Sequence, residues 1–211
     1  MIEPSALGVK EVVMDRSLMA WLDDYRRQGI DAVAREDELW QRFGRRCATL
    51  VLDSSGFTKS TAAHGMIYFL SKIAALRSIA EPIIQQHGAV RYAFEADNII
   101  GLFPTVLDAY AVAQGITDGL RQQRVMLEEG ELFHVCGGIG YGDILVDRGF
   151  GEFYGFEMNL ASKLGEDISG PDELYFTSAA YDAMGADERP ACEAVQLEIA
   201  GQQRRCYLLN M

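Results

Sequence analysis

The feature that most constrains the fold of this chain is the pairing of short apolar strands between amphipathic helices. After a helical N-terminal segment, the expected order is strand, helix, strand pair, helix, strand pair, helix, strand, helix and strand pair. Two strands joined by a short turn form an antiparallel pair, whereas parallel strands need a longer crossover. The sequence therefore predicts an α+β fold with a mixed, mostly antiparallel sheet flanked by helices, rather than a doubly wound parallel sheet.

The expected elements follow from apolar periodicity and from Gly and Pro positions. Apolar residues recur at helical spacing from about 12 to 43, with Gly29 as a candidate break. The predicted strands are 48–53, 90–94, 99–103, a pair within 132–147, 173–176, 195–199 and 204–209, and the later helices are 64–88, 105–125, 155–166 and 178–184. Pro82 is expected to kink or break the first of these helices. We expect an N-terminal helical segment, 1–44, and a second domain, 45–211.

Charge and composition exclude several classes of protein. The chain has 31 acidic and 19 basic residues, for a net charge of -12, which argues against nucleic-acid binding and against an anionic membrane surface. Its N-terminus lacks the pattern of a signal peptide, and no apolar run approaches the roughly 20 residues that span a bilayer. The four cysteines lie far apart without a CxxC pair, so neither a disulfide framework nor a zinc site is expected. We expect a cytoplasmic protein, or a soluble module of a larger assembly.

Two acidic residues occupy comparable positions in the predicted sheet. Asp53 ends the first strand, and Asp97 lies in the turn of the next strand pair. If those strands are neighbours, both carboxylates point at one place on the sheet edge, where they repel each other unless a cation lies between them. Oxygen ligands favour Mg²⁺ or Mn²⁺, and the small residues after Asp53 let backbone N–H groups approach an anion. The pattern predicts a metal–triphosphate site; the alternative is a helix-capping Asp53 and a turn Asp97, each common alone.

Four segments together resemble the class III nucleotidyl cyclase domains, the catalytic family of adenylate and guanylate cyclases. "LVLDSSGFT" resembles the first metal motif, "EADNIIGLF" the second, "CGGIGYGDIL" the "GIHTG" strand pair, and "GEFYGFEMNLASKLGED" the segment that carries Gly, Asn and then Ala-Ser-Arg. The motifs occur in the family's order and cover about residues 45 to 210. The resemblance implies a ferredoxin-like cyclase fold whose chains pair head to tail, with the active sites between them.

The resemblance also implies roles for individual residues. Asp53 and Asp97 would hold two Mg²⁺ or Mn²⁺ ions with help from the Ser54 carbonyl, and the Gly56-Phe57-Thr58 backbone would hold phosphate oxygens. The ribose 3′ hydroxyl would attack the α-phosphorus, and pyrophosphate would leave. From the partner chain, Asn159 would orient the ribose, and position 163 would stabilise charge on the α-phosphate.

Several positions depart from the family's pattern. Lys163 stands where the family usually has Arg, so a planar two-point contact becomes a point charge. Ala93 stands at the base-reading position, where adenylate cyclases have Lys and guanylate cyclases have Glu. Glu152 replaces the second base-reading residue, usually Asp, and can still accept from an adenine amino group. The family often has a phosphate-binding Lys near the last strand pair. In this chain Arg204 lies near that position, at a shifted spacing, and could take its role.

The leading hypothesis is therefore an enzyme, a homodimeric cyclase that converts ATP, in preference to GTP, into cyclic AMP. The second is a degenerate cyclase-homology module that binds a nucleotide or a partner, including a regulatory domain, without turnover. A metal-dependent phosphohydrolase is the third, because a metal–triphosphate site could also activate water.

Overall fold

The computed structural model describes residues 17–147 and 152–211, so the predicted helical residues before 17 lie outside the described part. The chain divides into two compact units. Of the described residues, the first unit contains 17–44, 145–147 and 152–153, and the second contains 45–144 and 154–211. The predicted domain boundary after residue 44 remains a prediction.

The first unit contains two helices joined by a short connection. α1 (Leu18–Gln28) begins with Ser17, whose hydroxyl accepts a hydrogen bond from the Ala20 amide, and it ends at Gly29 in the left-handed conformation (φ 68°). The 3₁₀ turn η1 (Val33–Arg35) leads into α2 (Glu36–Phe43). The predicted break at Gly29 is confirmed. One core cluster of this unit is formed by the buried side chains of Leu18, Tyr25, Leu39 and Phe43.

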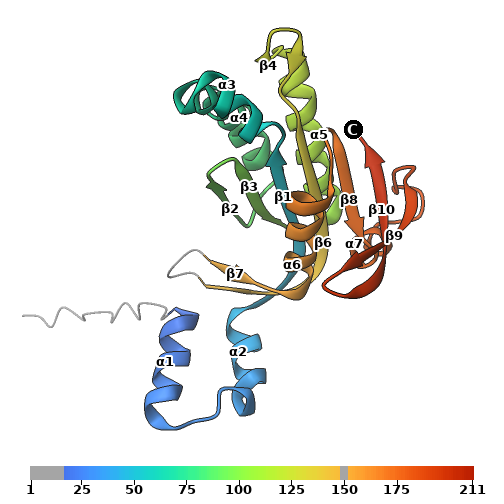
Figure 1. The fold of residues 1–211 in the computed structure, drawn as a ribbon. Helices are drawn as coiled ribbons and strands as arrows, with labels where there is room; N and C mark the ends of the chain where they lie inside the picture. The colour runs from blue at the N-terminus through green and yellow to red at the C-terminus, as the bar shows by residue number, and fades with distance from the viewer. Residues whose placement is uncertain (1–16, 148–151) are drawn as a thin grey trace, which may run out of the picture. The chain divides into compact units, whose positions relative to one another are not determined.

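The second unit is organised around one mixed sheet, in which neighbouring strands follow the order β2-β3-β1-β6-β8-β10-β9 (Figure 1). The strands are β1 (Gly44–Ser54), β2 (Arg91–Glu95), β3 (Asn98–Phe103), β6 (Val135–Val146), β7 (Phe153–Tyr154, paired with β6), β8 (Glu173–Thr177), β9 (Glu193–Ile199) and β10 (Gln202–Asn210), with β4 (Met126–Glu128) and β5 (Glu131–Leu132) in a separate pair. The pairs β1–β3, β2–β3, β8–β10 and β9–β10 are antiparallel, and β6–β8 is parallel. The predicted α+β class with a mostly antiparallel sheet is confirmed.

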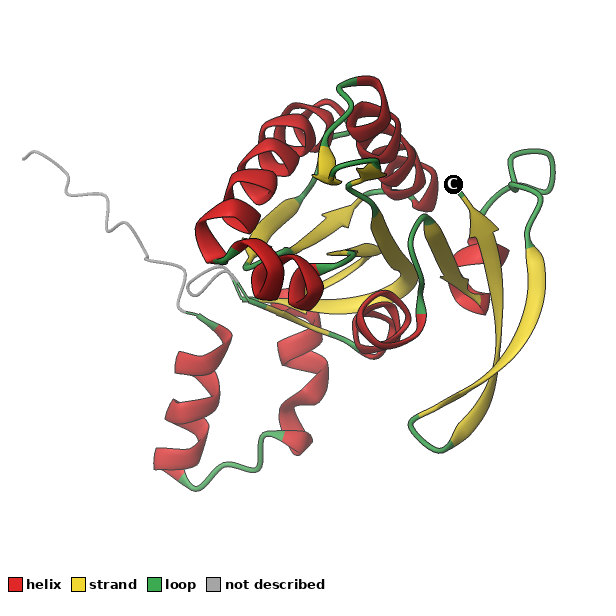
Figure 2. Cartoon of the chain, turned by 45° about the horizontal axis from the view of Figure 1, so that its top comes forward, coloured by secondary structure: helices red, strands yellow, loops and turns green. Residues whose placement is uncertain are grey.

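Helices cover both faces of this sheet, as Figure 2 shows. α4 (Met66–Gln86) and α5 (Val106–Gln122) share the main core with Leu174 and Phe176 of β8. Tyr175, between them in sequence, belongs to a second cluster with α6 (Phe156–Ser162) and the π-helical turn η2 (Lys163–Ile168). Because successive strand residues point to opposite faces, α6 and η2 lie on the face opposite α4 and α5.

The glycine-rich stretch of β6 lets α6 lie directly on the sheet. A Cβ atom on Gly140 would come within 2.3 Å of the Glu157 carbonyl oxygen, and one on Gly138 within 2.3 Å of the Ala161 carbonyl oxygen. The α6 backbone therefore approaches β6 closely at these two glycines. The expected strand pair is wrong, because Val135–Val146 is one strand. Gly142-Asp143 resembles a turn in sequence, but here the glycine makes room for the Glu157 side chain.

Two further expectations about helices need correction. The segment after Gly56 forms a short helix, α3 (Phe57–His64), and Gly65 separates it from α4. α4 continues through Pro82, so the proline does not break it. The predicted N-terminal cap of α5 is confirmed: the Thr105 hydroxyl accepts from the Asp108 amide at 3.1 Å. After α5, the short helix α7 (Ser178–Ala183) follows β8.

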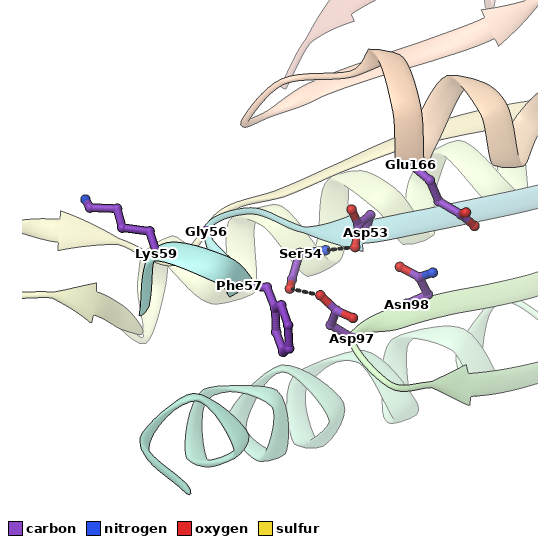
Figure 3. A pocket seen from close by; sticks show the side chains of 8 residues that line it. All are labelled: Asp53, Ser54, Gly56, Phe57, Lys59, Asp97, Asn98 and Glu166. Atoms are coloured by element: carbon purple, nitrogen blue, oxygen red, sulfur yellow. Dashed lines mark hydrogen bonds between the residues drawn. The ribbon is translucent and has the colours of Figure 1, made fainter. Parts of the chain in front are cut away.

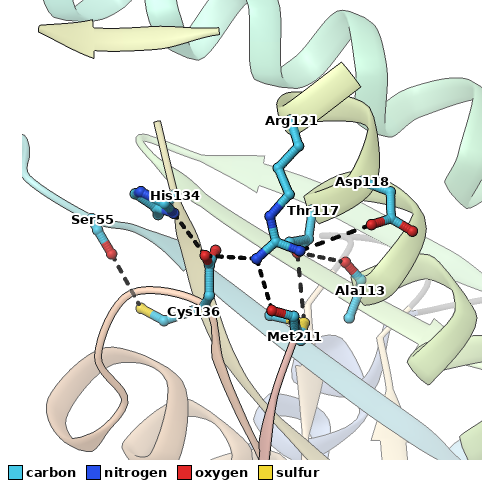
Figure 4. Close-up of polar contacts among 9 residues, drawn as sticks. Ser55, Ala113, Thr117, Asp118, Arg121, His134, Cys136 and Met211 are labelled. Carbon is cyan, nitrogen blue, oxygen red and sulfur yellow. Dashed lines mark hydrogen bonds and ion pairs between the residues drawn. The ribbon is translucent and has the colours of Figure 1, made fainter. Parts of the chain in front are cut away.

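A network of polar contacts connects the loops around the start of β6 (Figure 4). Arg121 of α5 donates to the Asp172 carboxylate at 2.8 Å and to the Met211 carbonyl at 2.7 Å. His134 Nδ1 lies 2.8 Å from the same carboxylate, and the His134 carbonyl accepts from the Ser55 amide at 3.0 Å. These contacts hold the turn after β1 against the beginning of β6.

No helix in the described ranges has the length and apolar character that crossing a membrane requires.

Candidate functional site

Strand pairing brings the two predicted metal ligands to one place. β1 and β3 are antiparallel neighbours with Leu52 opposite Ile99. Asp53, near the end of β1, therefore lies beside the start of β3. Asp97 lies in the turn between β2 and β3, immediately before that start. The condition set by the sequence, that these strands be neighbours, is met.

Ser54 connects the two aspartates, as Figure 3 shows. Its backbone amide donates to Asp53 Oδ1 at 2.8 Å, and its hydroxyl donates to Asp97 Oδ2 at 3.0 Å. The Ser54 side chain is buried, so this double contact is shielded from water. Ser54 therefore fixes the orientation of both carboxylates through its amide and its hydroxyl, a role beyond the carbonyl contact that the resemblance implies.

The aspartates open into a cavity of about 580 Å³, which lies in the usual range for a small-molecule site. Its lining residues are Asp53, Ser54, Gly56, Phe57, Lys59, Asp97, Asn98 and Glu166. Lys59, Asn98 and Glu166 were not predicted. Glu166 reaches the cavity from η2, where the helix widens to the π form. A pattern of 3.6 residues per turn does not reveal that shift, and in sequence Glu166-Asp167 reads as an exposed helix end.

The cavity is rich in negative charge. Burial, the neighbouring Asp97 and, more weakly, Glu166 raise the pKa of Asp53 from 3.8 to about 6, against the opposing hydrogen bond from the Ser54 amide. Partial burial and Asp167 raise the pKa of Glu166. The ammonium group of Lys59 forms ion pairs with Glu131 at 2.8 Å and Glu128 at 3.6 Å. Carboxylates that are held together with raised pKa values are suited to binding a cation.

The residues present fit a divalent metal ion of the Mg²⁺ or Mn²⁺ type. The available donors are carboxylate, hydroxyl and amide oxygens, and the buried Asn98 Oδ1 has no hydrogen-bond partner among the described residues. The described residues include no group of three or more His, Cys, Asp or Glu side chains placed to bind a metal by themselves. Two aspartates with an open cavity suit an ion that completes its coordination with water and phosphate oxygens.

The turn after β1 has the local form that a phosphate cradle requires. Gly56 has φ 91°, and a Cβ atom there would meet Leu127 Cδ2 at 2.5 Å, so a larger residue would strain the backbone and displace the Leu127 side chain. Phe57 packs edge-on against Phe69, with ring centroids 4.9 Å apart, and it is the first residue of α3, which Thr58 continues. This turn is therefore rigidly placed beside the aspartates.

The other predicted site residues do not line this cavity. Asn159 and Lys163 lie exposed on α6 and η2, and Lys163 Nζ forms an ion pair with Asp167 at 2.6 Å. Ala93 lies in the middle of β2, paired with Ile100. Arg204 lies on β10, with its guanidinium 4.8 Å from the centre of the Phe156 ring. Glu152 is exposed within 145–153, and its carbonyl accepts from the Asp147 amide. The structure thus brings the predicted metal residues Asp53, Ser54 and Asp97 together with Gly56 and Phe57 of the predicted phosphate turn. Thr58 is not among the lining residues, and the predicted ribose, base and α-phosphate residues and Arg204 also lie outside the cavity.

No protein-family model and no curated protein sequence matches the chain. Solved structures do match it. The adenylate/guanylate cyclase/hydrolase from Silicibacter pomeroyi is 21% identical, with 78% of this chain and 96% of that chain covered and a TM-score of 0.64. The guanylyl cyclase Cya2 is 19% identical, with 78% and 90% covered and a TM-score of 0.65. The adenylyl cyclase CyaB from P. aeruginosa is also 19% identical, with 78% and 94% covered and a TM-score of 0.62.

The fold is therefore that of the class III nucleotidyl cyclase catalytic domains, as the sequence motifs implied. At these identities the likeness establishes the architecture of the chain, and its chemistry has to be argued from its own residues.

Proposed function

We propose that this protein is a nucleotidyl cyclase that converts ATP into 3′,5′-cyclic AMP and pyrophosphate, at a site shared by two copies of the chain. Residues 45–211 would form the catalytic domain, and 1–44 a helical extension. The observation that carries the proposal is the joining of Asp53 and Asp97 in one cavity, with Ser54 hydrogen-bonded to both.

Each part of the cavity has a task in this reaction. Asp53 and Asp97 would hold two Mg²⁺ or Mn²⁺ ions, and Ser54 keeps the two carboxylates in place. When bound, the ions supply neutralisation of the triphosphate charge and a lowered pKa of the ribose 3′ hydroxyl. The rigid turn at Gly56 and Phe57 offers backbone N–H groups to phosphate oxygens. The bond from the 3′ oxygen to the α-phosphorus forms as the bond to the bridging oxygen breaks, the hydroxyl proton passes to solvent, and pyrophosphate leaves.

The residues of α6 would complete the site from the second copy. Asn159 would donate to or accept from the ribose, and Lys163 would place its charge at the α-phosphate. Both are exposed and lie outside the cavity of their own chain, which supports their acting on a nucleotide held by another copy. The ion pair of Lys163 with Asp167 is exposed, so it holds the lysine only weakly.

One alternative is supported by specific observations. Ala93 offers no hydrogen-bonding group for a base, and Lys163 is paired with an acid of its own helix. A regulatory module with this fold would bind a metal–nucleotide complex and signal to a partner without turnover.

The decisive experiment is to incubate the purified chain with ATP, and separately with GTP, in Mn²⁺ and in Mg²⁺. Cyclic nucleotide and pyrophosphate are then quantified by chromatography. We expect cyclic AMP from the wild type and none from Asp53→Ala or Asp97→Ala. Asp187→Ala is the matched control, because Asp187 is an exposed acid outside the cavity and its loss should leave activity unchanged.

The shared site is tested by mixing two inactive variants. Asp97→Ala and Asn159→Ala together should recover activity, because one of the two sites in a mixed dimer keeps both halves intact. Metal-dependent nucleotide binding without any cyclic product would favour the regulatory module. Phosphate release without cyclic product would favour a hydrolase.

A further inference from the structure

A line of three exposed side chains runs along α6 into η2. Phe156, Asn159 and Lys163 are spaced by three and four residues, so they lie on one face of the helix. Phe156 is 57% exposed, and Asn159 and Lys163 are exposed beside it. Leu160 and Leu164, which alternate with them, are buried against the sheet. We call this line of Phe156, Asn159 and Lys163 the α6 strip.

The aromatic end of the α6 strip is joined to a guanidinium group. Arg204 of β10 places its guanidinium carbon 4.8 Å from the centre of the Phe156 ring. Its Nη2 donates to Gln202 Oε1 at 2.6 Å, while its buried Nε has no hydrogen-bond partner among the described residues. The pair thus presents a ring and a planar cation that are held against each other from two different elements.

The order of groups along the α6 strip corresponds to the order of groups in a nucleotide. A helix rises about 1.5 Å per residue, so the backbone positions of the aromatic, the amide and the ammonium residue follow one another along the helix axis at steps of about 4.5 Å and 6 Å. Aromatic and guanidinium planes stack on bases, an amide hydrogen-bonds sugar oxygens, and an ammonium group pairs with phosphate. These are the requirements of base, ribose and phosphate, in that sequence.

We propose that the Phe156–Arg204 pair is the platform on which the nucleobase stacks, and that the site consequently discriminates little between adenine and guanine. This inference rests on the proposed function, because it assigns the base subsite of the same nucleotide. Stacking tolerates any base, since every base has a π-face. Ala93, at the position that resembles a base reader, adds no hydrogen bond that would reject the wrong purine.

We therefore expect only a weak preference for ATP over GTP. Glu152 can accept from an adenine amino group, but a single exposed carboxylate distinguishes two purines only modestly. We expect affinities for ATP and GTP within about tenfold of each other, because stacking involves no hydrogen bond that one purine makes and the other loses.

The test is calorimetric binding of ATP, GTP and inorganic triphosphate to the full chain in Mn²⁺, together with cyclisation assays. Phe156→Ala should weaken the binding of ATP and of GTP by a similar factor, about 5- to 150-fold if the stacking of one base is lost. The same variant should leave triphosphate binding unchanged, because that probe has no base. Phe156→Tyr keeps the ring and should bind as the wild type does. Val33→Ala, which truncates an exposed apolar side chain of the first unit, is the control.

The outcomes separate this inference from the proposed function. Cyclase activity with ATP binding unaffected by Phe156→Ala would overturn the platform and leave the enzyme standing. If Phe156→Ala loses affinity for ATP and GTP but not for triphosphate, and the wild type makes no cyclic product, the result would support the platform and contradict the proposed cyclase activity. The platform is also wrong if Phe156→Ala weakens triphosphate binding as much as ATP binding, if the wild type binds no nucleotide, or if its affinities for ATP and GTP differ by more than about tenfold.

Discussion

Replacing Asp53 by asparagine should stabilise the protein in the absence of metal while abolishing its response to Mn²⁺. The pKa of Asp53 in the folded protein is about 6, against an ordinary value of 3.8. The folded state therefore binds this proton more tightly than the unfolded state does. The contribution to the free energy of unfolding is complete below pH 3.8, falls as the pH rises toward 6, and is absent above that.

The magnitude follows from the size of the shift. Two pKa units correspond to about 3 kcal/mol at most, and Asp53 is only half-buried, so solvent screening reduces the effect to about 1–2 kcal/mol. Asparagine carries no charge and can still accept from the Ser54 amide, so it should recover this amount at pH 7.5. For a chain of this length we expect a Tm higher by roughly 3–6 °C.

The assay is thermal unfolding with a chelator at pH 7.5 and at pH 4.5, and then with Mn²⁺ at pH 7.5. The advantage of Asp53→Asn should shrink at pH 4.5, where the wild-type carboxyl is largely protonated. Mn²⁺ should raise the Tm of the wild type alone, because an ion that binds only the folded state stabilises it. Asp187→Asn is the control. A lower Tm for Asp53→Asn in chelator, or an equal Mn²⁺ response in both proteins, would refute the reasoning.

Three further changes test other contacts. Ser54→Ala removes the hydroxyl that holds the second aspartate, and should lower stability by about 1 kcal/mol and weaken Mn²⁺ binding, measured by calorimetry; an unchanged Tm and affinity would contradict this role. Lys163→Met should reduce kcat by about a hundredfold or more while Lys163→Arg retains or raises it, since the planar fork adds a second phosphate contact; a fast Lys163→Met enzyme would exclude the charge role. Gly140→Ala places a Cβ atom within 2.3 Å of the Glu157 carbonyl oxygen and should lower stability by about 2 kcal/mol or more, measured by denaturant titration, whereas Gly170→Ala should be close to neutral, because the nearest atom to its Cβ would be a Glu173 carboxylate oxygen at an ordinary 3.5 Å.

The pairing of the two aspartates could be predicted from sequence because local signals agree there. An apolar run that ends at Asp53 and a tight turn at Asp97 fix the ends of two strands, and alternation fixes the face each residue takes. The break at Gly29 and the start of a helix near Thr105 could be predicted for the same reason, because glycine commonly ends a helix and threonine commonly caps one.

Features that depend on tertiary packing could not be predicted. α3 is short and rich in small and polar residues, so it lacks the apolar stripe from which a helix is predicted. The π-helical turn that carries Glu166 into the cavity breaks the ordinary helical period. Gly142 stands in the middle of β6 because the Glu157 side chain lies against it, a reason invisible in the strand's own sequence.

The arrangement of acids connects the stability of this site with the metal binding that we propose. Asp53, Asp97 and Glu166 line one cavity, and the only basic side chain among its lining residues, Lys59, is paired with acids outside it. Ser54 already uses both its amide and its hydroxyl on the two aspartates. Burial of its carboxyl group and the remaining repulsion raise the pKa of Asp53 and destabilise the metal-free chain. A divalent ion would remove that repulsion on binding, so the group that costs stability in the free protein is the one that should give the metal complex its affinity.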